Sequence, residues 1–533
     1  MSWLGHRKRR QDTCNNEMTM IDRRNFLAVG FSWLLIGAAP GGVAGAQLGP
    51  VFGPPKPFSF DRLLRLAKAR AAEAYETSGA PASDLLKRID FDAVQKIRFR
   101  PEYELWGATA SRLPVSFFHL NKYAAAPVKI HAISGGMARE VLYGPQYFDY
   151  GGTGLEARVP VDAGFSGFRV MNGQASTTDW LAFQGASYFR SSGSDDQYGA
   201  SARGIAINTA LSTTEEFPRF SDFWLEEMGQ TVTIYALLDG PSITAAYRFD
   251  AVKSDSVVMG VHAELFAHAD ITRLGIAPLT SMYWYGENSR GTSIDWRPEV
   301  HDSDGLSMWT GHGERIWRPL DDPRALQTNS FADKNPKGFG LMQRDRNFEN
   351  YQDDGAFYNK RPGIWVEPRG DWGEGAVQLV EIPTDDETHD NIVAYWQPKS
   401  SVAAGDSFKL DYKLYWQDRE PNVTDAQARV VATRRGRGGI PGVPPSPAGK
   451  QKFVIDFEGG PLAQMEARYD VTPVVTTSRG KIDNAYVIKV VGTDRWRAFF
   501  DFVADGPAPV NLRCFLRLDG KALSETWLYQ YLA

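Results

Sequence analysis

Two short segments of this chain concentrate acidic and imidazole side chains. The first, WRPEVHDSDG (296–305), holds Glu299, His301, Asp302 and Asp304 within six positions. Asp302 and Asp304 are two residues apart, so an extended strand would point both carboxylates to one face, where like charges repel. Three uses fit such a cluster: a metal site, acid–base chemistry, or a solvated turn at Asp304.

The metal interpretation lacks the further ligands that it needs. The letters DSDG resemble the start of a calcium-binding loop, but Glu314 lies too far along the chain to complete that pattern. None of the eight histidines forms an HxH or HExxH pattern. We therefore expect neither a metal nor a cofactor.

The second cluster is EIPTDDETHDNIVAYW (381–396), with Asp386, Glu387, His389 and Asp390 just before an apolar strand. Two acids on opposite sides of a glycosidic bond can supply a proton donor and a water activator. Between the clusters the chain is rich in rings that could stack on sugars and in arginines that could bind hydroxyls. They are Trp309, Trp317, Tyr351, Phe357, Tyr358, Trp365, Trp372, Arg315, Arg318, Arg344, Arg346 and Arg361. Ordinary sandwich core is the alternative for the aromatic residues.

Residues 1–46 have the order of an export signal. Arg23 and Arg24 precede an apolar run of about 14 residues, which is shorter than the ~20 of a spanning helix. An A-x-A cleavage site follows at 44–46, and a membrane anchor is the alternative. The paired arginines are typical of the twin-arginine route, although Asp22 stands where that pattern usually has Ser or Thr. We therefore expect a periplasmic protein.

Charge and cysteine content narrow the partners. Residues 1–46 carry six of the 59 basic and three of the 64 acidic residues, which leaves 53 basic and 61 acidic residues, a net charge of −8. An acidic chain argues against nucleic acid, although the basic RRGRGG (434–439) could suggest it; a mobile loop near a polar ligand is the other interpretation. Cys14 leaves with the signal, so Cys514 has no intrachain disulfide partner.

Most of the remaining chain is predicted to form strands. The clearest segments are 96–106, 231–240, 242–252, 407–416 and 485–492, where β-branched and aromatic residues partly alternate between punctuating Gly, Asp and Pro. One helix is predicted at 60–76, capped by Ser59 or Asp61. With no βαβ rhythm, the pattern indicates an all-β fold built on an antiparallel β-sandwich.

A Gly/Pro-rich stretch at 434–450 cannot keep regular structure for long and indicates a boundary. We therefore predict a large β-sandwich domain at 47–419 that holds the site and a loop or linker at 420–450. The last segment, 451–533, has the length and short strands of a small immunoglobulin-like sandwich.

Ten segments together resemble the osmoregulated periplasmic glucan biosynthesis protein G/D family. They are RRNFL, FDAVQKIRFRPEYELW, ISGGMAREVLYGPQYFDY, GFSGFRV, FQGASYFRSSG, APLTSMYWYGEN, RPEVHDSDGL, ERIWRPLDDP, QRDRNFENYQ and TDDETHDNIVAYW. The resemblance runs from about residue 51 to the C-terminus, and the twin-arginine signal favours the D branch. It implies a large carbohydrate-processing β-sandwich followed by a small immunoglobulin-like domain.

The resemblance also implies action on β-1,2-linked glucan, as in inverting glycoside hydrolases that cleave internal bonds. It places the general acid at Asp390, the general base at Asp302, and a tyrosine that orders the water at Tyr358. The neighbouring residues that could take these roles instead are Asp386, Asp304 and Tyr351.

An inverting pair leaves room for water, with carboxyls roughly 6.5–9.5 Å apart, or farther if a water chain relays the proton. Asp390 must be protonated at rest, which burial or the neighbouring acids Asp386 and Glu387 could favour, whereas Asp302 must stay ionised, which Arg297 or His301 could ensure. Expected to bind the glucan are Arg297, Glu299, His301, Asp304, Trp309, Arg315, Trp317, Trp365, Glu387 and His389.

Three functions fit these observations: a β-1,2-glucanase, a transglycosylase in which a sugar hydroxyl replaces water, and a non-catalytic glucan-binding or assembly protein. The sequence does not separate the first two, because they differ only in the nucleophile that reaches the anomeric carbon. The expected partner is β-1,2-glucan, without nucleic acid and without stable membrane insertion after signal cleavage. A homodimer stays open.

Overall fold

The structure is a computed structural model that describes residues 48–76, 83–107, 113–174, 176–292, 295–438, 442 and 449–532. The export signal predicted for residues 1–46 lies outside the described residues. Within the described ranges, no helix has the length and apolar character needed to cross a membrane.

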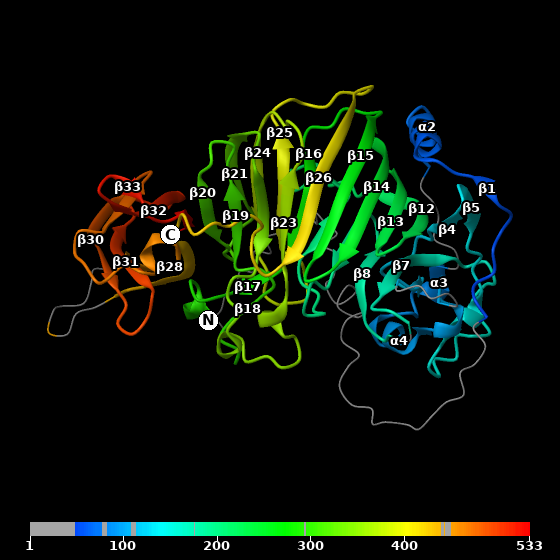
Figure 1. The fold of residues 1–533 in the computed structure, drawn as a ribbon, viewed down its shortest axis with the longest axis horizontal. Helices are drawn as coiled ribbons and strands as arrows, with labels where there is room; N and C mark the ends of the chain where they lie inside the picture. The colour runs from blue at the N-terminus through cyan, green and yellow to red at the C-terminus, as the bar shows by residue number, and fades with distance from the viewer. Residues whose placement is uncertain are drawn as a thin grey trace, which may run out of the picture.

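Two large sheets pack face to face and enclose the main core (Figure 1). Their inner faces meet through aromatic side chains, as where the rings of Phe183 and Phe249 lie 5.3 Å apart. In the described part of the chain, the first sheet has 16 strands. In spatial order they are β1 (Lys56–Pro57), β5 (Met137–Glu140), β4 (Lys129–Ser134), β12 (Arg219–Met228), β13 (Thr231–Asp239), β14 (Ile243–Lys253), β15 (Val257–Ala267), β26 (Ser407–Gln417), β23 (Gly363–Pro368), β22 (Gly338–Met342), β19 (Gly305–Trp309), β20 (Arg315–Pro319), β34 (Thr526–Tyr531), β32 (Val510–Leu518) and β29 (Thr472–Thr477), with β33 (Lys521–Ala522) beside β32.

The second sheet has 10 strands among the described residues. In order they are β21 (Gln327–Lys334), β24 (Glu374–Glu381), β25 (Ile392–Pro398), β16 (Leu274–Ser281), β10 (Ser201–Arg203), β9 (Tyr188–Ser191), β8 (Asp179–Gln184), β7 (Phe165–Met171) and β3 (Val115–His119), with β11 (Ile205–Ile207) beside β16. The predicted all-β sandwich is confirmed.

The strands with clear alternation lie where the sequence predicts them. The segments 231–240, 242–252 and 407–416 form β13, β14 and β26. β15 alternates strictly between buried and half-buried residues, which is the pattern of a strand with one face in the core.

The strand predicted at 96–106 is largely wrong. The helix α4 (Phe91–Lys96) ends there, and β2 (Arg98–Phe99) pairs over only two residues with β6 (Phe148–Asp149). The turn η1 (Pro101–Tyr103) follows, because Pro101 has no N–H to donate to a ladder.

The predicted helix at 60–76 is shorter than expected: α2 (Phe60–Arg70) ends at Arg70. The Ser59 side chain caps it by accepting the N–H of Arg62 at 3.3 Å. The helix lies on the outer face of the first sheet, where the Thr244 hydroxyl donates to the Ala67 carbonyl at 2.8 Å. The remaining short elements are α3 (Ser83–Leu86), η2 (Pro145–Tyr147), β17 (Tyr283–Tyr285), η3 (Arg290–Thr292), β18 (Val300–His301), η4 (Phe348–Asn350), η5 (Tyr358–Lys360) and η6 (Gly460–Leu462).

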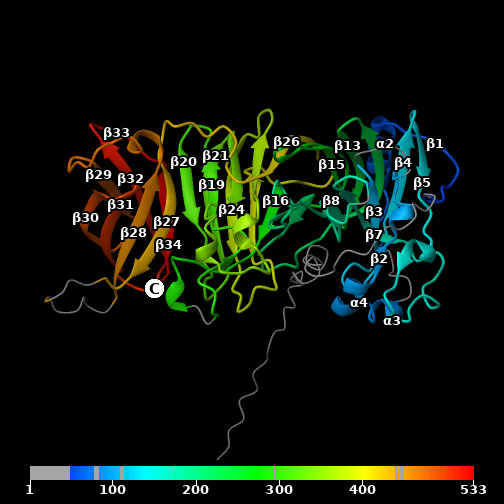
Figure 2. The same cartoon turned by 60° about the horizontal axis from the view of Figure 1, so that its bottom comes forward.

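The C-terminal strands gather at one end of the long axis (Figure 1, Figure 2). A four-stranded antiparallel sheet packs there against β29, β32 and β34 around a second core, which includes Phe453 and Trp527. Its strands, in order, are β27 (Arg429–Gly436), β28 (Lys450–Glu458), β31 (Trp496–Val503) and β30 (Lys481–Lys489). Because β27 lies within 420–450, the prediction of a loop or linker there is wrong at 429–436; the residues 439–441 and 443–448 lie outside the described part.

The junction between the C-terminal strands and the large sandwich is continuous. β34 pairs in parallel with β20, so Trp317 lies opposite Trp527. Beside it the buried Arg344 guanidinium binds the carboxylates of Glu420 and Glu525, the latter at 2.6 Å. Arg344 and Glu420 belong to the large sandwich and Glu525 directly precedes β34, so the Arg344–Glu525 pair crosses the junction and Glu420 balances the charge of its cation.

Acid should weaken this junction. Burial acts to raise the pKa of Glu420, but Arg344 outweighs it and lowers that pKa from 4.5 to about 2. The folded pKa is depressed, so the stabilisation is present above about 4.5 and is lost as pH falls through about 2. We expect Glu420→Gln to lower the free energy of unfolding by about 3 kcal/mol at neutral pH. In urea titrations at pH 7, 4 and 3, the gap to wild type should narrow with acid; a gap that stays constant would contradict this account.

Candidate functional site

The segment carrying Asp302 is anchored to the end of β16. The Asp302 N–H donates to the carbonyl of Met282 at 2.8 Å. The Ser281 hydroxyl donates to that of the next residue, Ser303, at 2.8 Å. Asp302 therefore lies just after β18 and beside the last residues of β16.

The segment carrying Asp390 is anchored to the same place. Asn391 is buried, accepts the N–H of Tyr283 at 2.8 Å and donates to the carbonyl of Tyr283 at 2.9 Å. Its side chain also donates to the Ile382 carbonyl at 3.0 Å, which closes the loop between β24 and β25. The two acid segments, nearly ninety residues apart in sequence, are thus fixed to three consecutive residues, 281–283.

Asp302 pairs with Arg361. Both side chains are buried, and the Arg361 guanidinium donates to the Asp302 carboxylate. Arg361 is held in place because it also donates to the Ala356 carbonyl at 3.0 and 3.1 Å. The sequence interpretation that Arg297 or His301 pairs with Asp302 is corrected here: the contacting cation is Arg361.

Tyr358 lies against the same guanidinium, which is 4.2 Å from the centre of its ring. Its hydroxyl donates to the Glu387 carboxylate. Gln343 fixes the backbone of this segment, since its amide donates to the carbonyls of His301 and Tyr358 at 3.0 and 3.1 Å. Tyr358 therefore connects the Asp302 pair with the loop that carries Asp390.

Arg297 binds Glu387 of that loop and two acids of other segments, Asp295 and Asp353, rather than Asp302. Its guanidinium lies 2.8 Å from Glu387, 2.8 Å from Asp353 and 2.9 Å from Asp295. Burial acts to lower the pKa of Arg297, but the bonds to Asp295, Glu387 and Asp353 raise it well above its ordinary value. Arg297 is therefore a permanent cation beside Glu387.

Asp390 is half-buried and lies in the electrostatic reach of Arg190 on β9. Arg190 is buried, and its guanidinium stacks 4.4 Å from the Tyr198 ring centre. Burial lowers the pKa of Arg190; the charge of Asp390 acts to raise it, and that of Arg361 acts to lower it. Asp302, Arg361, Arg190 and Asp390 therefore form a series of neighbouring charges. Sequence reasoning gave Arg190 no role, although it lies within the quoted segment FQGASYFRSSG.

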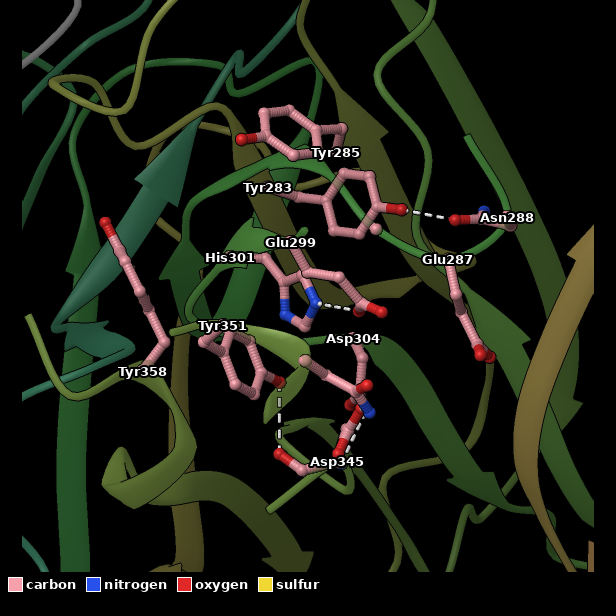
Figure 3. A network of polar contacts seen from close by, with 12 residues as sticks. Tyr283, Tyr285, Glu287, Asn288, Glu299, His301, Asp304, Asp345, Tyr351 and Tyr358 are labelled. Carbon is pink, nitrogen blue, oxygen red and sulfur yellow. Dashed lines mark hydrogen bonds and ion pairs between the residues drawn. The ribbon is translucent and has the colours of Figure 1, made fainter. Parts of the chain in front are cut away.

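A polar network supports the Asp302 side of the site (Figure 3). His301 is buried, and its two ring nitrogens lie 3.1 Å from the Glu299 carboxylate and 3.0 Å from the Gln343 amide oxygen. Burial acts to lower the pKa of His301, but the bond to Glu299 and the charge of Asp304 raise it. Glu299 and His301 thus form a buried hydrogen-bonded pair that positions the strand β18.

Asp304 and Tyr351, the alternatives to Asp302 and Tyr358, form hydrogen bonds to the backbone. Asp304 accepts the N–H groups of Arg344 and Asp345, both at 2.8 Å, so it stabilises a turn. It does not share a face with Asp302, because the two lie in the bend between β18 and β19. The Tyr351 hydroxyl donates to the Asp345 carbonyl at 3.0 Å (Figure 3).

Asp386 is bound within its own loop. It accepts the N–H of Thr388 at 2.7 Å and lies 3.3 Å from the His389 ring. Burial acts to raise the pKa of Asp386, but the bonds to Thr388 and His389 lower it. An acid kept ionised in this way is a poor proton donor, which favours Asp390 for that role.

Four residues expected to bind glucan are packed against other protein groups, although Trp317 also lines a small cavity with Glu299, His301 and Asp304. Trp317 and Trp365 are 4% and 1% exposed and pack in the core next to the C-terminal strands. Trp309 ends the strand that starts beside Asp304, about 17 Å along the chain, and its ring is covered by the Arg315 guanidinium at 3.6 Å. This packing argues against stacking on a sugar, and the core interpretation holds for these rings.

No group of three or more His, Cys, Asp or Glu side chains is arranged for a metal ion in the part of the chain that the structure describes. The acid clusters instead contact arginine, tyrosine and backbone groups.

The protein is thus all-β, and the segments that carry Asp302 and Asp390 are both hydrogen-bonded to residues 281–283 at the end of β16. Residues 58–531 match the family model described as "Periplasmic glucan biosynthesis protein, MdoG", so the chain belongs to this family. It is 48% identical over 530 residues to glucans biosynthesis protein D 2 of Ralstonia nicotianae, covering 96% of this chain and 98% of the relative. It is also 46% identical over 491 residues to glucans biosynthesis protein D of Stenotrophomonas maltophilia, covering 90% of each. The predicted family and its D branch are confirmed.

Among solved structures, a polysaccharide lyase aligns with 69% of this chain and 44% of its own, with a TM-score of 0.19 and 9% identity. A likeness at that level supports no statement about this chain.

Proposed function

We propose that this protein cleaves internal β-1,2-glucosidic bonds of a periplasmic glucan with inversion, with Asp390 as general acid and Asp302 as general base. The observation that supports this most is the convergence of the two acid segments on residues 281–283. Two carboxylates on separate loops can face one bond from opposite sides, as inversion requires.

The environments of the two acids suit different roles. The Asp302 carboxylate is paired with the buried Arg361 guanidinium, and a carboxylate in contact with a cation suits the role of a base. Asp390 is half-buried on a loop, where it can approach a leaving oxygen. A general acid must carry its proton before the reaction begins. We therefore propose that bound glucan covers the half-buried Asp390 and thereby favours its protonated form.

Tyr358 is proposed to order the attacking water. Its ring contacts the guanidinium that holds Asp302, and its hydroxyl donates to Glu387 on the loop of Asp390. Because Asp302 is only 1% exposed, the attacking water would pass its proton to Asp302 through a second ordered water. Arg297, Glu387 and His389 remain the proposed glucan contacts. Glu299, His301 and Asp304 are proposed to hold the backbone of the site in position without touching the glucan.

Purified protein incubated with linear β-1,2-glucan tests this proposal. We expect new reducing ends and shorter chains, measured by a reducing-sugar assay and mass spectrometry. Redistribution of chain lengths without new reducing ends would show transfer to a sugar hydroxyl, which the same acid supports. Unchanged glucan that still binds the protein would leave a binding or assembly role and contradict catalysis.

We also propose that the protein reaches the periplasm by the twin-arginine route. The support is the pair Arg23 and Arg24 ahead of the apolar run, together with membership in a family described as periplasmic. β-1,2-glucan is the proposed partner, and self-association of the chain stays a prediction.

A further inference from the structure

A cavity of about 420 Å³ lies outside the acid site, at the β3 end of the second sheet. Its walls come from α4, β2, β3 and β7, which lie at the end of the molecule opposite the C-terminal strands (Figure 2). The volume falls in the range of roughly 300–1,000 Å³ that is usual for small-molecule sites.

Buried polar groups line this cavity. Glu104 is 4% exposed and accepts the Ser116 hydroxyl at 2.7 Å. The buried Nε of Arg169 has no hydrogen-bond partner among the described residues, although its guanidinium lies 3.6 Å from Asp179. An unmade hydrogen bond of a buried donor is costly, so an acceptor on a ligand would bind favourably there.

Basic and acidic side chains are equal in number in the wall. Three arginines and three acids line the cavity, and burial raises the pKa of Glu104 among them: Arg98, Arg100, Arg169, Glu102, Glu104 and Asp149. His119 adds no charge at neutral pH, because burial lowers its pKa. A balanced wall with donors, acceptors and the ring of Phe118 suits a neutral ligand rich in hydroxyl groups, rather than a phosphate or a metal ion.

The cavity is connected by strand register to the acid site. Ser116 lies opposite Arg169, Arg169 opposite Ala182, and Ala182 opposite Arg190, so their side chains share one face of the sheet. Arg169 and Arg190 are two strand spacings apart, about 10 Å. The charge of Asp390 acts on Arg190, as it does on Tyr188 of the same strand.

We propose that this cavity binds glucose units of the glucan chain at a distance from the bond that is cut. The proposal rests on the proposed function for the identity of the sugar. It gives the protein a preference for long chains, because only a long chain reaches both the cavity and the acids.

Calorimetric titration with long linear β-1,2-glucan and with its tetrasaccharide tests this, in an Asp390→Asn background so that the glucan stays intact. Arg169→Met removes the guanidinium, and Thr177→Trp fills the mouth of the cavity from an exposed position. Val161→Trp is the matched control, since Val161 is 77% exposed in the segment before β7. Thermal melting identifies any variant that fails to fold.

We expect both cavity variants to bind the long glucan at least about tenfold more weakly than the parent. This factor corresponds to the free energy of one charge-assisted hydrogen bond. The control should bind like the parent. If Arg169→Met does not fold, Thr177→Trp decides.

If the parent binds glucan and the folded cavity variants bind it with the same affinity, the inference about the cavity is overturned while the proposed function stands. No glucan binding by the parent would overturn the proposed function and, with it, the sugar assigned here. Saturable binding of inorganic phosphate that Arg169→Met abolishes would overturn the assignment of a neutral ligand.

Discussion

Asp390→Asn is expected to lower turnover on β-1,2-glucan by at least ~10²-fold, because an unactivated sugar leaving group needs the proton that the amide cannot supply. Asn keeps the size of the side chain, and Asp390 is half-buried. We therefore expect glucan affinity and melting temperature to stay near those of wild type.

The matched control is Asp386→Asn, a change of the same chemistry four residues away on the same loop. Asp386 is bound to Thr388 and His389, so it is expected to keep most of the turnover. An Asp390 variant that keeps more than about half its turnover, with loss at Asp386 instead, would move the acid to that residue. Loss at neither would contradict Asp390 as the acid, and Glu387→Gln would then test a third acid of this loop.

Asp302→Asn is expected to lower turnover by a similar factor and, unlike Asp390→Asn, to lower stability as well. Asp302 and Arg361 are a buried ion pair, and removing one partner of such a pair costs about 3–5 kcal/mol because the other charge stays buried. Activity assays and urea unfolding on the same preparation measure both effects.

A second substitution separates the two effects. Arg361→Gln in the Asp302→Asn background removes the uncompensated cation, so part of the stability should return while turnover stays low. Return of turnover together with stability would mean that Asp302 acts only by neutralising the buried Arg361 charge, and not as a base. Adding Asp390→Asn to Asp302→Asn should cost little more activity, since the two acids act as a unit.

Strands could be predicted from the sequence where the two-residue alternation of apolar and polar residues matches the alternation of buried and exposed side chains. β26 and the second half of β14 have one face in the core, and alternation locates them, whereas β13 is buried almost throughout and is located by its β-branched and apolar residues. The helix α2 ends at Arg70 although helix-forming residues continue, because helical stability comes from packing and its buried residues end at Ala67. β27 was missed because its RRG end continues into the Gly/Pro-rich segment, while its pairing with β28 is a tertiary contact.

The candidate site was predictable only in part, for a similar reason. Family motifs point to Asp302, Asp390 and Tyr358, but the partners of these residues come from distant strands. Arg361 follows Asp302 by 59 positions, and nothing in local spacing predicts that contact. The burial of Trp317 and Trp365 could not be predicted, because a ring that stacks on sugar and a ring that fills a core have the same composition signal.

The configuration of the first product tests the central claim most directly. Wild-type protein and β-1,2-glucan, followed by proton NMR before the sugar ring re-equilibrates, should release chains whose new reducing end is the α-anomer. Inversion of a β-bond by one acid and one base through water requires that result. Release of the β-anomer at early times would show retention through a covalent intermediate, and it would contradict the roles proposed for Asp390 and Asp302.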